Sequence, residues 1–65
     1  MTLEQDLRYI DRCADRLADG LDLHAYHIGN LYFIQKRLEA NSQAPKEYIE
    51  LVKNLQHNRL CRSAL

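Results

Sequence analysis

The sequence predicts an all-α fold: a small three-helix domain, made of a helical hairpin and a third helix. Apolar residues recur three and four positions apart in three stretches, and no stretch alternates apolar and polar residues as a half-buried strand does. Breakers are few, since Gly20, Gly29 and Pro45 are the only glycine and proline residues in the chain. Its 65 residues make a single domain, residues 1–65. A chain of this size buries only about 60% of its unfolded surface, so we expect a second copy to stabilise it.

The first helix is expected to begin after Thr2. Thr2 at the cap and Gln5 three residues later can each satisfy an unpaired backbone N–H group. The apolar residues that follow have heptad spacing and form a narrow seam: Leu3, Leu7, Ile10, Ala14, Leu17 and Leu21. Aspartates and arginines occupy the opposite side, which we interpret as a solvated face with pairs three or four residues apart. Gly20 is expected to end the helix in a left-handed conformation.

The second helix is expected to start with Asp22 as its cap, with Leu21 and Tyr26 as a hydrophobic staple, and to run to about Ala40. One broad apolar face carries Leu23, Ile28, Leu31, Ile34 and Leu38. A second stripe carries Tyr26, Phe33 and Ala40, and a third side carries Ala25 and Tyr32. A helix that is apolar on most of its circumference is normally surrounded. Two short helices cannot surround it, so the sequence predicts a homodimer that forms through this helix.

The third helix is expected to begin at Pro45, which suits a first helical turn. Its core stripe is Tyr48, Leu51, Val52 and Leu55, flanked by Ile49. The same stripe continues to Arg59 and Arg62, so we expect the apolar face to end near Leu55. The last turns then either project beyond the core or place these two arginines against an acidic group.

Charge and cysteine content restrict the classes of function. Nine Lys and Arg balance nine Asp and Glu, which disfavours a nonspecific polyanion binder. The balance hides a gradient: residues 1–22 hold six acids and three arginines, while residues 23–65 hold six basic residues and three acids. No basic stretch leads into an apolar run, and no apolar run is long enough to span a bilayer. We therefore expect no membrane association, a cytoplasmic location and free thiols.

No catalytic residue, metal ligand or cofactor is predicted. His24 and His27 are three residues apart, and His57 precedes Cys61 by four, as metal ligands on a helix can be. No zinc or hydrolase signature accompanies these spacings. We interpret His27 as a half-buried histidine bonded to backbone or a tyrosine hydroxyl, and Cys13 and Cys61 as small apolar groups. A metal-responsive helical protein is the second alternative for the function, and enzyme activity is not expected.

A small DNA-binding transcriptional regulator is the first alternative, because three short helices can form a helix-turn-helix and the C-terminal helix is mildly basic. Three features count against it. The basic residues of that helix are diluted by Glu47 and Glu50, the first half of the chain would repel phosphate, and the connection between the second and third helices lacks a glycine. Nucleic acid is therefore not the favoured partner.

The aromatic residues carry the leading hypothesis. Of the five aromatics, only Tyr48 lies centrally on a core stripe, and tyrosine is enriched at protein interfaces. Packing within the chain explains Tyr26 and Phe33 equally well. We choose the interface, and Gly29 adds a small residue where another helix can approach. The sequence thus predicts a small non-enzymatic protein-binding regulator, an adaptor or inhibitor, whose partners are itself and an unidentified protein. The residues predicted to bind them are Tyr26, Gly29, Tyr32, Phe33 and Arg37.

Overall fold

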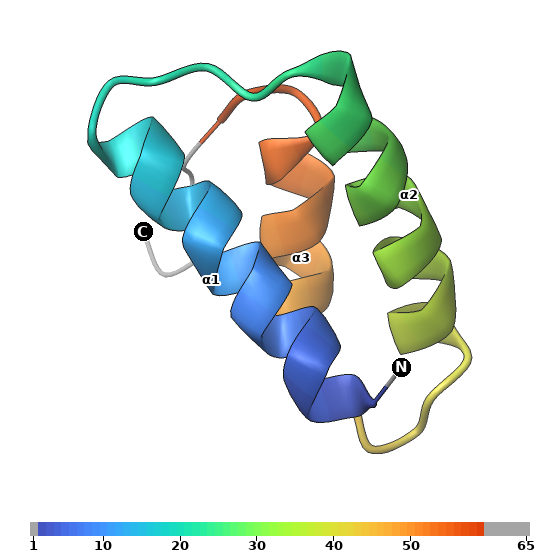
Figure 1. Ribbon diagram of the computed structural model, residues 1–65. Helices are drawn as coiled ribbons and strands as arrows, with labels where there is room; N and C mark the ends of the chain where they lie inside the picture. Colours follow the sequence, from blue (N-terminus) through green and yellow to red (C-terminus); the bar gives the residue numbers. More distant parts are fainter. Residues whose placement is uncertain (1, 60–65) are drawn as a thin grey trace.

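The computed structural model describes residues 2–59, and within that range the chain forms helices and no strand (Figure 1). The helices are α1 (Leu3–Ala18), α2 (Ala25–Glu39) and α3 (Lys46–Leu55). α1 and α2 form a V that opens toward the loop joining them, and α3 lies behind the space between them. The prediction of an all-α three-helix domain is confirmed.

Both ends of α1 follow the sequence signals. The backbone N–H of Gln5 donates to Thr2 Oγ1 at 3.2 Å, and the backbone N–H of Thr2 donates to Gln5 Oε1 at 3.1 Å, which completes the capping box. At the other end Gly20 has φ +82°. The N–H of Leu21 donates to the carbonyl of Arg16, and that of Gly20 to the carbonyl of Leu17, so the helix closes in a Schellman motif.

The start of α2 differs from the prediction. Asp22 does not cap the helix, which begins at Ala25 after His24. Leu23 remains outside the helix because its side chain, 5% exposed, fills the core, and its N–H donates to Asn58 Oδ1 at 2.8 Å. The staple does not form, since Leu21 is 50% and Tyr26 74% exposed. Burial of Leu23 and a hydrogen bond from a distant residue outweigh a local cap worth about 1 kcal/mol.

α3 begins one residue after Pro45 and ends at Leu55, where the sequence placed the end of the apolar face. The chain then turns, and Asn58 has φ 53°, in the left-handed region. His57 therefore lies outside α3. The prediction that His57 and Cys61 lie four residues apart on one helix is wrong, because His57 is not helical. Cys61 and Arg62 lie outside the described residues.

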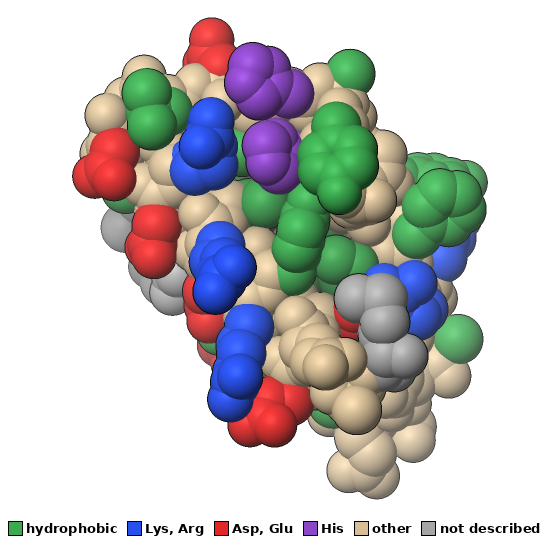
Figure 2. All heavy atoms as spheres, viewed as in Figure 1, with side chains coloured by type: hydrophobic (Ala, Val, Ile, Leu, Met, Phe, Trp, Pro, Cys, Tyr) green, Lys and Arg blue, Asp and Glu red, His purple; other side chains and the backbone are tan. Residues whose placement is uncertain are grey.

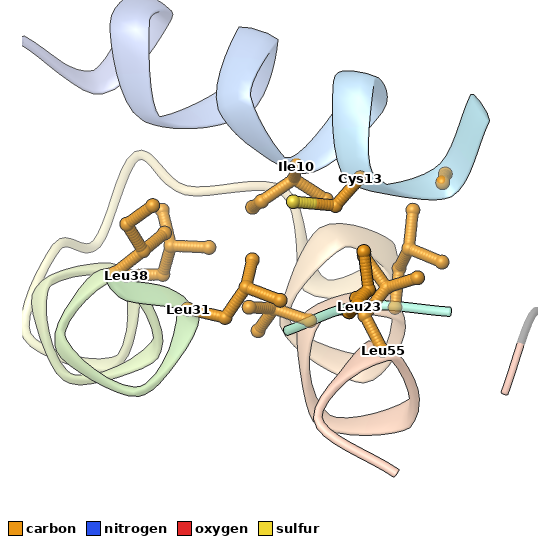
Figure 3. Close-up of a cluster of buried hydrophobic side chains, with 10 residues drawn as sticks. Ile10, Cys13, Leu23, Leu31, Leu38 and Leu55 are labelled. Atoms are coloured by element: carbon orange, nitrogen blue, oxygen red, sulfur yellow. The ribbon is translucent and has the colours of Figure 1, made fainter. Parts of the chain in front are cut away.

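A closed hydrophobic core joins the three helices (Figure 3). Ten buried residues form it: Ile10, Cys13, Ala14, Leu23, Leu31, Ile34, Leu38, Leu51, Val52 and Leu55. The predicted stripes of α2 and α3 supply most of them. From the seam of α1, Ile10 and Ala14 are buried, while Leu3, Leu7 and Leu17 are half-buried and pack against the cluster. Cys13 is buried with a free thiol, as the small apolar group we expected.

None of the helices in the described part of the chain has the length and hydropathy that a membrane span requires.

Candidate protein-binding groove

Three aromatic side chains of α2 project into solvent. Tyr26 is 74%, Phe33 62% and Tyr32 47% exposed. Their position follows from the core: Leu31, Ile34 and Leu38 are buried and fix the rotation of α2, so residues a third of a turn away from that stripe face outward. The core is thus closed within one chain, and these aromatics are what it leaves uncovered.

Tyr26 and Phe33 line a groove between α1 and α2 with a volume of about 360 Å³. Tyr9 comes from α1, while the rest of the lining comes from α2: Tyr26, Asn30, Phe33, Ile34 and Arg37. Ile34, 2% exposed, lies at the base, and Asn30 Nδ2 donates to the Tyr9 hydroxyl at 3.0 Å. Burial raises the pKa of Tyr9 above its usual value, against the opposing effect of this hydrogen bond. Figure 2 shows hydrophobic side chains gathered in the hollow between the two helices.

An ion pair between a buried aspartate and a half-exposed arginine joins α1 to α2 at Arg37. Arg37 Nε donates to Asp6 Oδ2 and Nη2 donates to Asp6 Oδ1, both at 2.9 Å, so the pair is bidentate. The Asp6 side chain is 3% exposed and that of Arg37 43%. The hydrogen bond to Asp6 raises the pKa of Arg37, against the opposing effect of desolvation. Arg37 therefore stays charged, and Asp6 compensates its charge within the chain.

Two histidines lie near Tyr26, where the interhelical loop enters α2. The rings of His24 and His27 are stacked with centroids 5.8 Å apart, and His27 also meets Tyr26 edge-on at 5.6 Å. The backbone N–H of His24 donates to His27 Nδ1 at 3.4 Å, which confirms the half-buried, backbone-bonded His27 that the sequence predicted. Within residues 2–59, no group of three or more His, Cys, Asp or Glu side chains is placed to hold a metal ion.

Arginines of α1 border the groove. Arg8 and Arg12 line an adjoining hollow of about 150 Å³ together with Gln5 and Tyr9, and Tyr9 belongs to both hollows. Arg8 pairs with Glu4 at 3.6 Å, but both side chains are more than 70% exposed. Arg12 forms no ion pair with any described residue. Figure 2 shows this basic edge running along α1 beside the hydrophobic hollow.

The charged face of α1 differs from the predicted arrangement of paired aspartates and arginines. Its ion pair among the described residues is Glu4 with Arg8, and Asp11 instead accepts a hydrogen bond from the Tyr48 hydroxyl of α3 at 3.1 Å. Asp11 is half-buried, and both of its carboxylate oxygens lie within hydrogen-bond distance of the Tyr48 hydroxyl, at 3.1 and 3.2 Å.

The structure brings together part of the predicted binding set. Tyr26, Phe33 and Arg37 share the groove. Tyr32 lies on the adjacent outer strip, where its ring meets Phe33 edge-on at 5.8 Å and the Lys36 ammonium lies 5.3 Å from the ring centroid. Gly29 is exposed, and a Cβ there would have nothing within 4 Å.

Sequence reasoning did not find the contributions of Asp6, Tyr9 and Asn30. A signal existed for Asp6: it precedes Ile10 by four residues and Cys13 by seven, so the same arithmetic that found the seam places this carboxylate on the buried side of α1. Tyr9 and Asn30 left no such signal, because their hydrogen bond depends on how α1 and α2 are placed against each other.

Comparison with protein-family models, with curated proteins and with solved structures yields no match to this chain.

Proposed function

We propose that this protein is a small non-enzymatic protein-binding regulator, an adaptor or an inhibitor, that docks its partner on the aromatic outer face of α2. The observation that carries the proposal is the exposure of Tyr26, Phe33 and Tyr32, between 47% and 74%, on a helix whose core stripe is fully buried. The fold does not use these side chains for its own core.

Aromatic groups in this setting suit an interface. Tyr and Phe bring large apolar area with few rotatable bonds, and anchors of this kind dominate binding energy at protein interfaces. Tyr26 and Phe33 stand on a helix held by the core, so little ordering is needed when a partner covers them. The groove beside them offers a concave surface in which an anchor of the partner can be buried.

The homodimer predicted from the sequence belongs to the same proposal, because a second copy is one candidate occupant of this face. α1 and α3 cover the stripe of Leu31, Ile34 and Leu38 completely. A second copy is therefore needed only to cover the exposed aromatic side chains, Tyr26, Tyr32 and Phe33. Sedimentation equilibrium of the wild-type chain and of Phe33→Ala tests self-association: loss of a dimer in the variant, with helicity unchanged, supports docking of a second copy here.

A partner other than the chain itself is tested by site-specific photo-crosslinking in the native cell. A photoreactive phenylalanine at position 26 or 33 reports on the face, and the same group at Glu47, an exposed residue of α3, is the matched control. Adducts to a defined protein from positions 26 and 33 and none from 47 are expected. Equal labelling from all three positions would contradict the proposal.

The DNA-binding and metal-responsive alternatives stay predictions without an observation in their favour. α3 ends at Leu55, so Arg59 does not extend its surface as a recognition helix would need, and Lys53 lies 3.8 Å from Glu50.

A further inference from the structure

We infer that the groove between α1 and α2 holds an amphipathic helix of a partner protein, one that places apolar side chains in the groove and acidic side chains against the arginines of α1. This inference rests on the proposed function and names the chemistry of the partner. Three properties of the groove carry it: a mainly apolar lining, a length that accommodates helical anchors, and a basic rim.

The lining of the groove is mainly apolar and has no uncompensated charge, and its polar Asn30 already donates a hydrogen bond to the Tyr9 hydroxyl. Its base is Ile34 and its walls are the rings of Tyr9, Tyr26 and Phe33. Arg37 also contributes, but its guanidinium is already bonded twice to Asp6. A cavity of about 150 Å³ suffices for a benzene molecule, so a groove of about 360 Å³ accepts more than one apolar side chain.

The groove follows α2 over three helical turns. Tyr26, Asn30, Phe33 and Arg37 are spaced four, three and four residues apart, which sets them in one line along the helix. At 1.5 Å per residue that line is about 16 Å long. Helices that dock into grooves present anchors at positions i, i+3 or i+4, and i+7, a span of about 10.5 Å that fits within this line.

The rim supplies the sign of the partner's charge. Arg8 and Arg12 line the hollow that adjoins the groove at Tyr9, and no carboxylate of the described residues lines either hollow. Arg12 has no ion-pair partner in residues 2–59. The ion pair of Arg8 with Glu4 is exposed and therefore weak, so Arg8 can exchange Glu4 for a carboxylate of the partner. On the far side of the exposed aromatics, Lys36 lies over Tyr32. Carboxylates beside the apolar anchors complement this rim.

The same charges argue against the other occupants. A two-fold dimer built groove against groove would set the arginines of one copy against the basic rim of the other, a like-charge contact without a lining carboxylate to offset it. A single-stranded nucleic acid needs a positive track for its backbone. In this groove the charge of Arg37 is already compensated by Asp6, and the chain has no net charge.

The test uses a labelled synthetic peptide that forms an amphipathic helix, with leucines at i, i+4 and i+7 and glutamates beside them. Binding to the full chain is followed by fluorescence anisotropy, and the site by amide chemical shifts. We expect saturable binding, with the largest shifts at Tyr26 and Phe33. A peptide with lysines in place of the glutamates is expected to bind at least about tenfold more weakly, as is the acidic peptide to Arg8→Glu/Arg12→Glu. The control Lys46→Glu/Lys53→Glu, with the same charge change on α3, is expected to bind like wild type.

Each other outcome overturns the inference. If both peptides bind equally and Phe33→Ala weakens both, the groove binds protein without charge selection, and the proposed function survives the failure. If no peptide shifts the groove signals while photo-crosslinking at position 33 yields a partner, the partner does not dock as an acidic helix. If self-association occupies the groove, or an oligothymidine strand binds it more tightly than the acidic peptide, the occupant is a second copy or a nucleic acid. Circular dichroism of each variant confirms that it is folded.

Discussion

Among residues whose side chains are as exposed as that of Arg37, we expect the replacement of Arg37 by Met to destabilise the protein most. Arg37 is 43% exposed, yet it makes two 2.9 Å hydrogen bonds to Asp6, whose side chain is 3% exposed. Without the guanidinium, the carboxylate remains in the interior without its cation. The penalty arises at the buried partner and not at the residue that is changed.

The magnitude follows from what Asp6 can do after the change. Removing one partner of a fully buried pair costs about 3–5 kcal/mol. Solvent reaches the half-exposed Arg37 and screens the pair, so we expect a loss of about 2–4 kcal/mol. The total stability of a chain of this size is about 3–10 kcal/mol.

Two matched variants separate this effect from general damage. Asp6→Ala releases an arginine that solvent can already reach, so it is expected to cost about 1 kcal/mol, and adding Arg37→Met to it should cost little more. Arg8→Met removes an arginine from the exposed pair with Glu4 and is expected to cost less than about 0.5 kcal/mol. Urea unfolding at pH 7, followed by circular dichroism, measures all four variants. If Arg37→Met is as mild as Arg8→Met, or Asp6→Ala as costly as Arg37→Met, the reasoning from unequal burial is wrong.

Three further expectations follow from burial and backbone geometry. Phe33→Ala should change the free energy of unfolding by about 0.5 kcal/mol or less, because Phe33 is 62% exposed. Ile34→Ala should cost about 2–5 kcal/mol, because the neighbouring Ile34 is 2% exposed. Equal losses in urea melts would place Phe33 in the core. Asn58→Ala and Asn58→Gly both lose the hydrogen bond to the N–H of Leu23. Asn58→Ala also places a Cβ without a polar side chain at φ 53°, so it should be less stable than Asn58→Gly by about 1 kcal/mol. A thermal melt in which the two variants coincide would refute this. Burial raises the pKa of the Cys13 thiol above its usual value, so the folded state holds this proton more tightly than the unfolded state. Stability therefore declines as pH rises from the usual thiol pKa through the folded one. Cys13→Ala should make that decline shallower, and an unchanged pH profile would exclude the thiol as its cause.

Much of the fold could be predicted because it is local. The Thr2 capping box, the left-handed Gly20, the buried stripe of α2 and the end of the apolar face of α3 at Leu55 each depend on residues within one or two helical turns. Spacing and cap chemistry are present in the sequence itself, so these features were predicted from it.

The candidate site could be predicted only in part. The sequence marked Tyr26 and Phe33 as lying off the core stripe of their helix, and both are exposed, which agrees with that prediction. Whether the surface binds a partner stays a proposal. The sequence did not show that Tyr9 of α1 completes a groove with them, because helical periodicity says which side of a helix a residue occupies and not which neighbour it meets.

The sequence by itself determined the fold class, most helix ends and the apolar stripes, since each is encoded by residues close together along the chain. The tertiary structure decided how α1 and α2 meet, and with it the Asp6–Arg37 pair and the Tyr9–Asn30 hydrogen bond. It also moved the start of α2 to Ala25, because Leu23 is buried and held by Asn58, 35 positions further along the chain. Such contacts between distant residues compete with local signals. The burial of Leu23 is worth more than a helix cap by Asp22, so the contact between distant residues decides where α2 begins.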